Sequence, residues 1–497
     1  MAQAVAILGT ASDVGKSLVS AAICRLLHRA GVQVAPFKAQ NMSLNSFVTL
    51  DGGEMGRAQV LQAQACGVEP HVDMNPILLK PEADHQSQVI VQGKVWKRQE
   101  AGQYFRNKEY LWDVVQASYQ RLAQAYSVIV IEGAGSAAEI NLRDRDIVNW
   151  PVVELADAAV VLVADIDRGG VFAQIFGTLD LLSEQERKRV HGIVINKFRG
   201  DLQLFEDGVR MIENRTGIPV LGVLPFLRPL ELDQEDSVDI ERFQTTPFTN
   251  NTVNIAVILL PHMSNFTDFN HLAAESDVAL RYASSPENIR GADVVIIPGS
   301  KTTIADLDYL KKSGWETSLN QYVSEGHELV GICGGFQMLG QKISDPHQVE
   351  TGGEQKGFDF LSVVTELSLA KRTSQIQARP LHLPQVSDCM IQGYEIHMGI
   401  TTGTSVDPCF EIYSDGKKTF DGARSPITHV WGTYLHGVFD NPEFRRAWLN
   451  QARARKKLAP LEIGMSNAVS ARLSQALDLW ADHVEDHVNW RSLFPEL

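Results

Sequence analysis

The sequence predicts an α/β protein with two doubly wound, mostly parallel-sheet domains. Short apolar runs alternate with amphipathic helical segments in two separate parts of the chain. Between them, residues 228–254 are first acidic and then rich in Thr, Pro and Asn, which indicates a domain boundary. We therefore expect a first domain over 1–230, a linker over 231–251, a second domain over 252–445 and a helical C-terminal extension over 446–497.

The composition is that of a soluble globular protein. Of 497 residues, 44% are hydrophobic, and the net charge of −15 argues against binding to nucleic acid or to an anionic membrane. Five scattered cysteines without a Cys-x-x-Cys pair argue against a disulfide framework, so we expect the reducing cytoplasm as the compartment. No apolar run is long enough to span a bilayer. A homo-oligomer is compatible with this composition.

The first domain opens with a strand, a tight loop and a helix that together predict a nucleotide site. An apolar run over 4–8 leads into the loop 9–17, and an amphipathic segment follows over 18–29. Backbone N–H groups of the loop, at Thr10, Asp13 and Gly15, would face the phosphates of ATP. The Lys16 ammonium would reach the outer phosphates, and the Ser17 hydroxyl would ligate Mg²⁺. The usual pattern has glycine at position 10, whereas this chain has it one residue earlier; the alternative is a chance Gly-Lys-Ser at a helix start.

Polar residues follow the next predicted strands, at the sheet edge where α/β proteins bind ligands. The strand over 32–37 ends in a polar run that contains Lys38, Gln40 and Asn41, and Lys38 is either a substrate contact or a solvated charge. The strand over 127–131 ends at Glu132, the usual place for a second Mg²⁺ ligand beside a P-loop. The strand over 191–195 ends at Asn196, which either reads a purine base or caps a helix.

The second domain contains the signature of a cysteine nucleophile. A strand over 328–332 runs into Cys333 within a Gly-x-Cys-x-Gly turn, and a helix follows. Such a turn exposes the thiol, and the helix N-terminus favours the thiolate; a buried structural thiol is the alternative. The backbone N–H groups of Gly299 and Gly334 would form an oxyanion hole. Near the end of the domain, His436 closes an apolar stretch and would serve as base and acid.

These motifs resemble a known family. The glycine spacing before Lys16 is similar to that of the dethiobiotin synthetase-like P-loop ATPases, and Ala11 stands where the partitioning ATPases carry a signature lysine. The second half resembles a class I glutamine amidotransferase domain. Many such domains have Glu two residues after the histidine, but this chain has Val438 there, and the cobyrinic acid amidase type also lacks the Glu. The third member of the triad is therefore undecided, with Glu395 and His397 as candidates by motif.

An ATPase half followed by an amidotransferase half resembles the arrangement in the cobyrinic acid amidase family. This resemblance covers essentially the whole chain. Three stretches, 38–46, 52–59 and 132–149, are similar to the branch that amidates the b, d, e and g carboxylates of the corrinoid adenosylcobyrinic acid a,c-diamide. The resemblance implies ATP, glutamine and Mg²⁺, with Lys38, Gln40 and Asn41 at the substrate and Asn196 at adenine. An a,c-diamide synthase or a cell-wall precursor amidase is the alternative within the family. A P-loop switch of the partitioning type is the competing class, and Ala11 and the Cys333/His436 pair argue against it.

Overall fold

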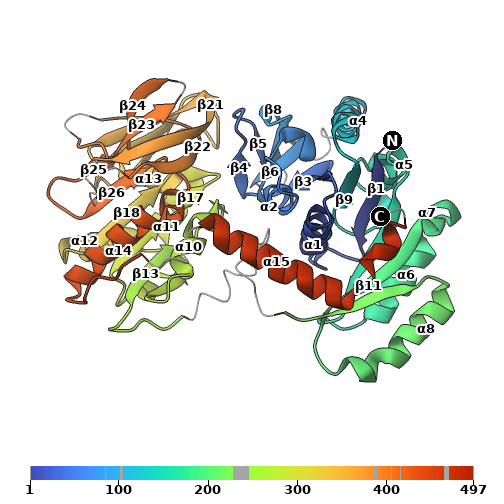
Figure 1. Ribbon diagram of the computed structural model, residues 1–497. Coiled ribbons are helices and arrows are strands. Elements are labelled where there is room, and N and C mark those ends of the chain that lie inside the picture. The colour runs from blue at the N-terminus through green and yellow to red at the C-terminus, as the bar shows by residue number, and fades with distance from the viewer. Residues whose placement is uncertain are drawn as a thin grey trace. The chain divides into compact units, whose positions relative to one another are not determined.

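The computed structural model describes residues 2–83, 86–100, 105–227, 246–381, 383, 389–403, 406–414, 416–463 and 469–495 (Figure 1). Most of the predicted linker over 231–251 lies outside these residues. The chain divides into two compact units, and each has its own sheet. The first comprises 1–43, 54–233 and 472–497, and the second comprises 44–53 and 234–471.

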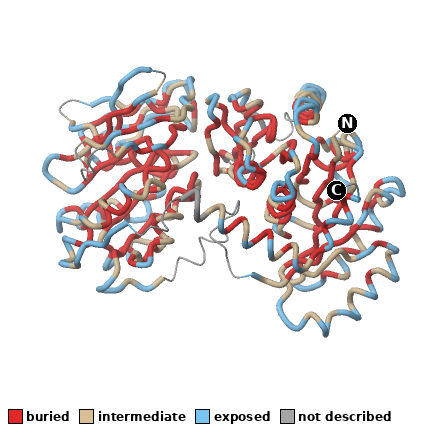
Figure 2. Tube along the Cα trace, viewed as in Figure 1, coloured by how far each residue is buried: buried red, intermediate tan, exposed pale blue. Residues whose placement is uncertain are grey.

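A six-stranded parallel sheet forms the centre of the first unit, in the order β12-β11-β10-β1-β9-β2. Its strands are β1 (Gln3–Gly9), β2 (Val34–Phe37), β9 (Val128–Glu132), β10 (Ala159–Asp165), β11 (Val190–Phe198) and β12 (Val220–Pro225). The apolar runs of the sequence become strands whose residues are mostly buried in the middle of the sheet (Figure 2), whereas the edge strand β12 is mostly half-buried. β1 lies between β9 and β10, so the loop after it lies in the middle of the sheet edge.

Helices cover this sheet, and a smaller sheet joins them. The helices of the first unit are α1 (Lys16–Arg29), α2 (Arg57–Ala65), α4 (Lys108–Ala125), α5 (Trp150–Leu155), α6 (Val171–Leu181), α7 (Glu184–Lys188) and α8 (Glu206–Thr216). The small sheet has the order β3-β6-β7-β8, with β3 (Gln40–Met42), β6 (Ile77–Ala83), β7 (Gln86–Val91) and β8 (Lys94–Glu100). Strand β5 (Glu54–Gly56) directly precedes α2.

The second unit also has a central sheet, in the order β15-β13-β16-β18-β26-β25. The first five strands are parallel: β13 (Val253–Ile258), β15 (Val278–Ala283), β16 (Val294–Ile297), β18 (Glu328–Ile332) and β26 (Val430–Thr433), while β25 (Ala423–Arg424) is antiparallel. Its helices are α10 (Asn270–Ala273), α11 (Thr303–Lys312), α12 (Trp315–Ser324), α13 (Gly334–Leu339) and α14 (Pro442–Arg455). The predicted α/β fold with two mostly parallel sheets is thus confirmed.

A second sheet in this unit was absent from the sequence prediction. It contains β19 (Lys342–Asp345), β20 (Gly353–Lys356), β21 (Val363–Pro380), β22 (Ile391–Gly403), β23 (Phe410–Ser414) and β24 (Lys417–Asp421). β21 and β22 form a long antiparallel pair that is interrupted between Leu367 and Arg372. β21 alternates buried and exposed residues at its start, as expected of a strand with one buried face.

Two segments belong to a different unit from the one that the chain order suggests. Residues 44–53, which fall within the predicted first domain, are part of the second unit. The predicted extension over 446–497 divides: α14 packs in the second unit, whereas α15 (Val469–His487) contributes from Arg472 onward to the first. There Trp480 donates to the carbonyl of Leu18 at 2.7 Å, and Arg25 pairs with Asp478 at 2.8 Å. The amphipathic tail is therefore a helix that packs against α1 in the first unit.

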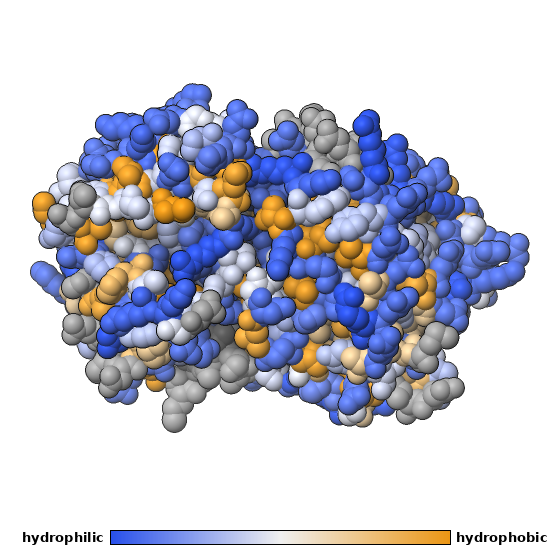
Figure 3. Space-filling model, turned by 90° about the horizontal axis from the view of Figure 1, so that it is seen from above, coloured by the Kyte–Doolittle hydropathy of each residue, from blue (hydrophilic) through white to orange (hydrophobic). Residues whose placement is uncertain are grey.

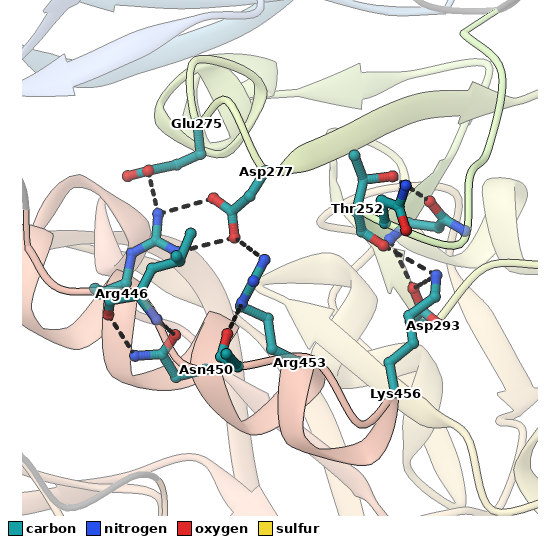
Figure 4. A network of polar contacts seen from close by, with 12 residues as sticks. Thr252, Glu275, Asp277, Asp293, Arg446, Asn450, Arg453 and Lys456 are labelled. Carbon is teal, nitrogen blue, oxygen red and sulfur yellow. Dashed lines mark hydrogen bonds and ion pairs between the residues drawn. The ribbon is translucent and has the colours of Figure 1, made fainter.

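Helix α14 is attached to the second unit by a buried network of ion pairs (Figure 4). Asp277 accepts from Arg446 and from Arg453, in each case at 3.0 Å, and Glu275 pairs with Arg446 as well. At the end of the helix, Lys456 pairs with Asp293 at 2.8 Å. The sequence predicted a solvated helix face for the basic cluster over 453–457, and this prediction is wrong for Arg453, which is buried and paired with Asp277. The structure shows that several of them are structural ion-pair partners.

The visible face of the molecule is mostly hydrophilic, with hydrophobic residues in small groups among the polar ones (Figure 3). Among the described helices, none is both long enough and apolar enough to cross a membrane.

The ion-pair network predicts a large effect of Asp277→Asn on stability. Burial raises the pKa of Asp277, but the guanidinium groups of Arg446 and Arg453 outweigh it and hold the pKa below its usual value. The stabilisation is therefore present above about pH 4 and is lost as the pH falls through the lower folded value. Asn at this position carries no charge, so the buried guanidinium groups of Arg446 and Arg453 would lose an anionic partner. We therefore expect the free energy of unfolding at pH 7 to fall by about 3 kcal/mol.

Chemical denaturation of Asp277→Asn and of a matched control measures this effect. The control is Asp308→Asn, because Asp308 forms an exposed pair with Lys312 and its loss should cost less than about 0.5 kcal/mol. Equal stability of the two variants would contradict the assignment.

Candidate active sites

The P-loop lies between β1 and α1, as predicted. Lys16 donates to the carbonyl oxygens of Ala11, at 3.0 Å, and Gly135, at 2.9 Å. Gly15 has φ 99°, and a Cβ at this position would lie 2.2 Å from the amide nitrogen of Asn196, so the turn requires glycine. The loop thus has the tight curvature that lets backbone N–H groups and Lys16 face a phosphate.

The buried carboxylate of Glu132 lies directly beside the P-loop. Ser17 donates to it at 2.7 Å, Lys38 at 2.9 Å and Gln62 at 2.5 Å. Burial raises the pKa of Glu132, but the charge of Lys38 and the hydrogen bonds outweigh it and lower the pKa overall. An ionised carboxylate next to a hydroxyl is a hard-oxygen donor set that suits Mg²⁺. The structure therefore places Ser17 and Glu132, which the sequence analysis proposed as Mg²⁺ ligands, next to each other and to Lys38, which it proposed as a substrate contact or a solvated charge.

Two further residues predicted for the first unit, Asn41 and Gln40, lie in or beside the network around Glu132. Asn41 donates to Gln59 at 2.9 Å, and Gln59 donates to Glu132 at 3.4 Å, so Asn41 belongs to the same network. Gln40 lies next to it in β3. The sequence analysis missed Gln59 and Gln62, although both lie on one face of α2 at the helical spacing of three.

Asn196, which the sequence analysis proposed as an adenine contact or a helix cap, is buried next to the P-loop. Its Nδ2 donates to the carbonyl of Val14 at 2.8 Å, and its Oδ1 accepts from the backbone of Lys197 at 2.8 Å. Both ends of the amide thus bond to the protein backbone, and the geometry supports a brace for the P-loop. Thr10 donates to Gln174 at 3.3 Å, and the carbonyl of Asp13 accepts from Lys197 at 2.6 Å.

In the second unit, Cys333 occupies the predicted turn between β18 and α13. Its backbone has φ 52° and ψ −107°, a conformation that residues other than glycine rarely adopt. The neighbouring glycines are required by close packing, because a Cβ on Gly335 would lie 2.0 Å from the carbonyl oxygen of Ile297. The thiol lies 3.6 Å from the carbonyl oxygen of Ile396. Strain at a nucleophilic residue is typical of a functional site.

His436 interacts with Cys333 and with a carboxylate that the sequence analysis missed. Its Nδ1 lies 2.7 Å from Oδ2 of Asp268, and Oδ1 of Asp268 accepts from the backbone of Gly437 at 3.1 Å. Burial lowers the pKa of His436, but Asp268 and Cys333 outweigh it and raise the pKa to about 10. The carboxylate of Asp268 therefore favours the protonated form of the His436 ring. The geometry therefore favours Asp268 as the candidate for the third position of the triad, and it follows β13, at the carboxyl edge of the sheet.

The two earlier candidates for the third position have other partners. Glu395 pairs with Arg372, and burial raises the pKa of Glu395 to about 7. The Nδ1 of His397 lies 2.8 Å from the carbonyl oxygen of Gly399, and burial lowers the pKa of His397 to about 3. Neither makes the hydrogen bond to His436 that orients a general base.

The two glycines predicted for the oxyanion hole lie close to one another, Gly299 in a short strand and Gly334 at the first residue of α13. A Cβ on Gly299 would lie 3.6 Å from Cε1 of His436, and a Cβ on Gly334 would lie 2.8 Å from the backbone nitrogen of Ser300. The loop around Gly299 is held by pairing of β17 (Gly299–Ser300) with β14 (Met263–Ser264). The cysteine, the histidine and these glycines thus form one compact cluster.

The comparisons with known proteins match both halves. A CobQ/CobB/MinD/ParA nucleotide binding domain matches residues 5–237, and a CobB/CobQ-like glutamine amidotransferase domain matches residues 254–444. Cobyric acid synthase from Salmonella enteritidis PT4 is 48% identical over 98% of this chain and 97% of its own length. The chain belongs to the cobyric acid synthase family. Members from Klebsiella pneumoniae strain 342 and Citrobacter koseri are 48% and 47% identical over 98% and 99% of this chain and 97% and 98% of their own. A solved glutamine amidotransferase matches 40% of this chain and 98% of its own length at 17% identity, with a TM-score of 0.32.

The triad geometry predicts a change in both rate and pH dependence for Asp268→Asn. Because the carboxylate supports the imidazolium, its loss should lower the glutaminase rate by about 10³- to 10⁴-fold. The wild-type imidazolium should deprotonate only as the pH rises through about 10, whereas in the variant the alkaline limb of the pH profile should move to lower pH. Glutamate release measured from pH 6 to 11 tests both. An unchanged alkaline limb would remove Asp268 from the triad.

The network around Glu132 predicts a metal-dependent defect for Glu132→Gln. The amide keeps the shape but removes the charge, so synthesis with glutamine or with ammonia should require more Mg²⁺ than the wild type does. Titration of ADP formation with Mg²⁺ measures this requirement. The control is Glu154→Gln, which alters an exposed residue of α5. If both variants respond to Mg²⁺ as the wild type does, Glu132 is not a ligand.

Proposed function

We propose that this chain converts adenosylcobyrinic acid a,c-diamide into adenosylcobyric acid by amidating its b, d, e and g carboxylates. ATP and glutamine are the co-substrates, and the product belongs to cobalamin biosynthesis. The observation that carries the proposal is the similarity to cobyric acid synthases over 98% of the chain. The presence of both a P-loop with a buried carboxylate and a Cys–His–Asp cluster supports it.

The second unit would release ammonia from glutamine. The Cys333 thiolate attacks the carboxamide carbon, and the oxygen gains negative charge near the backbone of Gly299 and Gly334. His436 then donates its proton to the departing nitrogen, so the carbon–nitrogen bond breaks and ammonia leaves. Water hydrolyses the remaining thioester, with His436 now accepting the proton. Asp268 holds the ring in the orientation that both proton transfers need.

The first unit would activate the corrinoid carboxylate. A carboxylate oxygen attacks the γ-phosphorus of ATP, ADP leaves, and an acyl phosphate forms. Lys16 would offset the charge on the transferring phosphoryl group, and we assign Lys38 to the activated carboxylate, with Gln40 and Asn41 beside it. Ser17 and Glu132 would hold Mg²⁺, which when bound supplies positive charge at the phosphates. Ammonia then attacks the acyl carbon, and phosphate leaves.

Mass spectrometry of the reaction products tests the function directly. With cobyrinic acid a,c-diamide in its adenosylated form, ATP and glutamine, we expect four successive shifts of one amide each. An a,c-diamide synthase would leave this substrate unchanged, because its two positions are already amidated. A corrinoid that is unchanged after full ATP turnover would contradict the proposal.

A Cys333→Ser variant serves as the internal control for the nitrogen source. The serine hydroxyl is a much weaker nucleophile in this turn, so amidation with glutamine should be lost. Ammonium salt at high pH should restore the four mass shifts, because ammonia needs no release step. Retained amidation with glutamine would exclude Cys333 as the nucleophile.

A further inference from the structure

We infer that the segment Leu44–Gly53, here called the strap, completes the glutaminase site, and that Asn45 is a positioning residue for the Asp268–His436 pair. The strap belongs to the second unit, although both flanking parts of the chain belong to the first. The inference rests on the proposed function, because it assigns a role in glutamine hydrolysis.

The strap holds the short turn that carries the triad aspartate. Asp268 lies in the 3₁₀ turn Phe266–Phe269, and Asn265, with φ 53°, precedes this turn. The backbone N–H of Phe266 donates to Oδ1 of Asn45 at 3.2 Å, and the backbone N–H of Ser46 donates to Oδ1 of Asn265 at 3.1 Å. Asn45 therefore satisfies an N–H group at the start of the turn, as a capping side chain does for a helix.

The same contacts extend to the histidine. Nδ2 of Asn265 lies 3.5 Å from each ring nitrogen of His436. Tyr394 stacks on His436 with ring centres 5.3 Å apart and planes at 15°, and its hydroxyl donates to the carbonyl of Ser46 at 3.4 Å. The strap thus forms hydrogen bonds with Asn265, which lies next to the His436 ring, and with Tyr394, which stacks on that ring.

Apolar and backbone contacts fix the remainder of the strap. Val48 packs with Tyr394 and Ile396, and the ring of Phe47 lies 5.6 Å from that of Tyr394. Gln375 donates to the carbonyl of Val48, and Thr373 donates to the carbonyl of Gly52 at 2.9 Å. Ile396 is also the residue whose carbonyl lies 3.6 Å from the Cys333 thiol. Every one of these partners is within the second unit.

Loss of the Asn45 oxygen should loosen the turn and thereby the hydrogen bond from Asp268 to His436. A small displacement of a positioned group lowers catalytic rates strongly, so we expect Asn45→Ala to reduce the kcat of glutamine hydrolysis by about 10- to 100-fold. The pKa of His436 should fall as well. The titratable groups that act on His436 are Asp268, Cys333, Glu395 and His397, and of these only Asp268 lies in the turn that Asn45 holds.

The experiment compares three variants of the full chain: Asn45→Ala, Asn45→Asp, which keeps an acceptor oxygen of the same shape, and Leu50→Ala. Leu50 lies in the strap and is 73% exposed, so it is the matched control. The measurements are glutamate release across pH 6–11, amidation with ammonium salt, and thermal unfolding. We expect Asn45→Ala to lose glutaminase activity with its alkaline limb moved to lower pH, Asn45→Asp to recover most of the activity, and Leu50→Ala to match the wild type.

Three outcomes would overturn the inference: glutaminase activity of Asn45→Ala equal to that of Leu50→Ala, a reduced rate with an unmoved alkaline limb, or equal loss of ammonia-dependent amidation. These outcomes differ from failure of the proposed function. A wild-type chain that hydrolyses glutamine but leaves the corrinoid unchanged would contradict that function and leave the role of Asn45 intact.

Discussion

The buried contact between His436 and Asp268 is the interaction on which the amidotransferase half depends. An imidazole at this depth would be neutral, because burial disfavours its charged form. The carboxylate reverses that preference and keeps a proton on the ring beside the Cys333 thiol. The positive φ of Cys333, the glycines around it and the turn that carries Asp268 all serve to bring these three side chains together.

The nucleotide-binding half also stabilises a buried charge with a partner of opposite charge, but here the buried charge is a carboxylate and the partner is a lysine. Glu132 is buried at a strand end, and Lys38 together with neutral donors keeps it ionised. In each unit a parallel sheet places a charged group at its carboxyl edge, and a second group from a different loop holds its charge state. The two halves therefore resemble each other in how they prepare their chemistry, although their reactions differ.

The residues that sequence reasoning identified are those whose chemistry is tied to a local pattern. Lys16, Ser17 and Cys333 stand in glycine-containing turns between a strand and a helix, and such turns are visible in a single stretch of sequence. Glu132 was recognised for the same reason, as an acid that ends an apolar strand. The parallel strands could likewise be predicted, because buried strands read as continuous apolar runs.

The residues that were missed are those whose role depends on distant parts of the chain. Asp268 lies 168 positions from His436, and nothing near it in the sequence marks it as a partner. The β21–β22 pair was missed because charged and polar residues fill its exposed side, and no turn signal at its interruption indicates a strand. The contact between Asn196 and the P-loop carbonyl of Val14 was missed for the same reason, since the two residues are 182 positions apart.

The strap belongs to the second unit although its neighbours in the sequence belong to the first, and this limits where the chain can be cut. Cutting the chain between residues 227 and 246 would give two fragments, and each fragment would keep its own catalytic motifs. The amidotransferase fragment would nevertheless lack residues 44–53, and the nucleotide-binding fragment would lack the helix that covers α1. Each unit therefore contains a segment that is distant in the sequence from the rest of that unit, and no single cut between the catalytic motifs leaves both units complete.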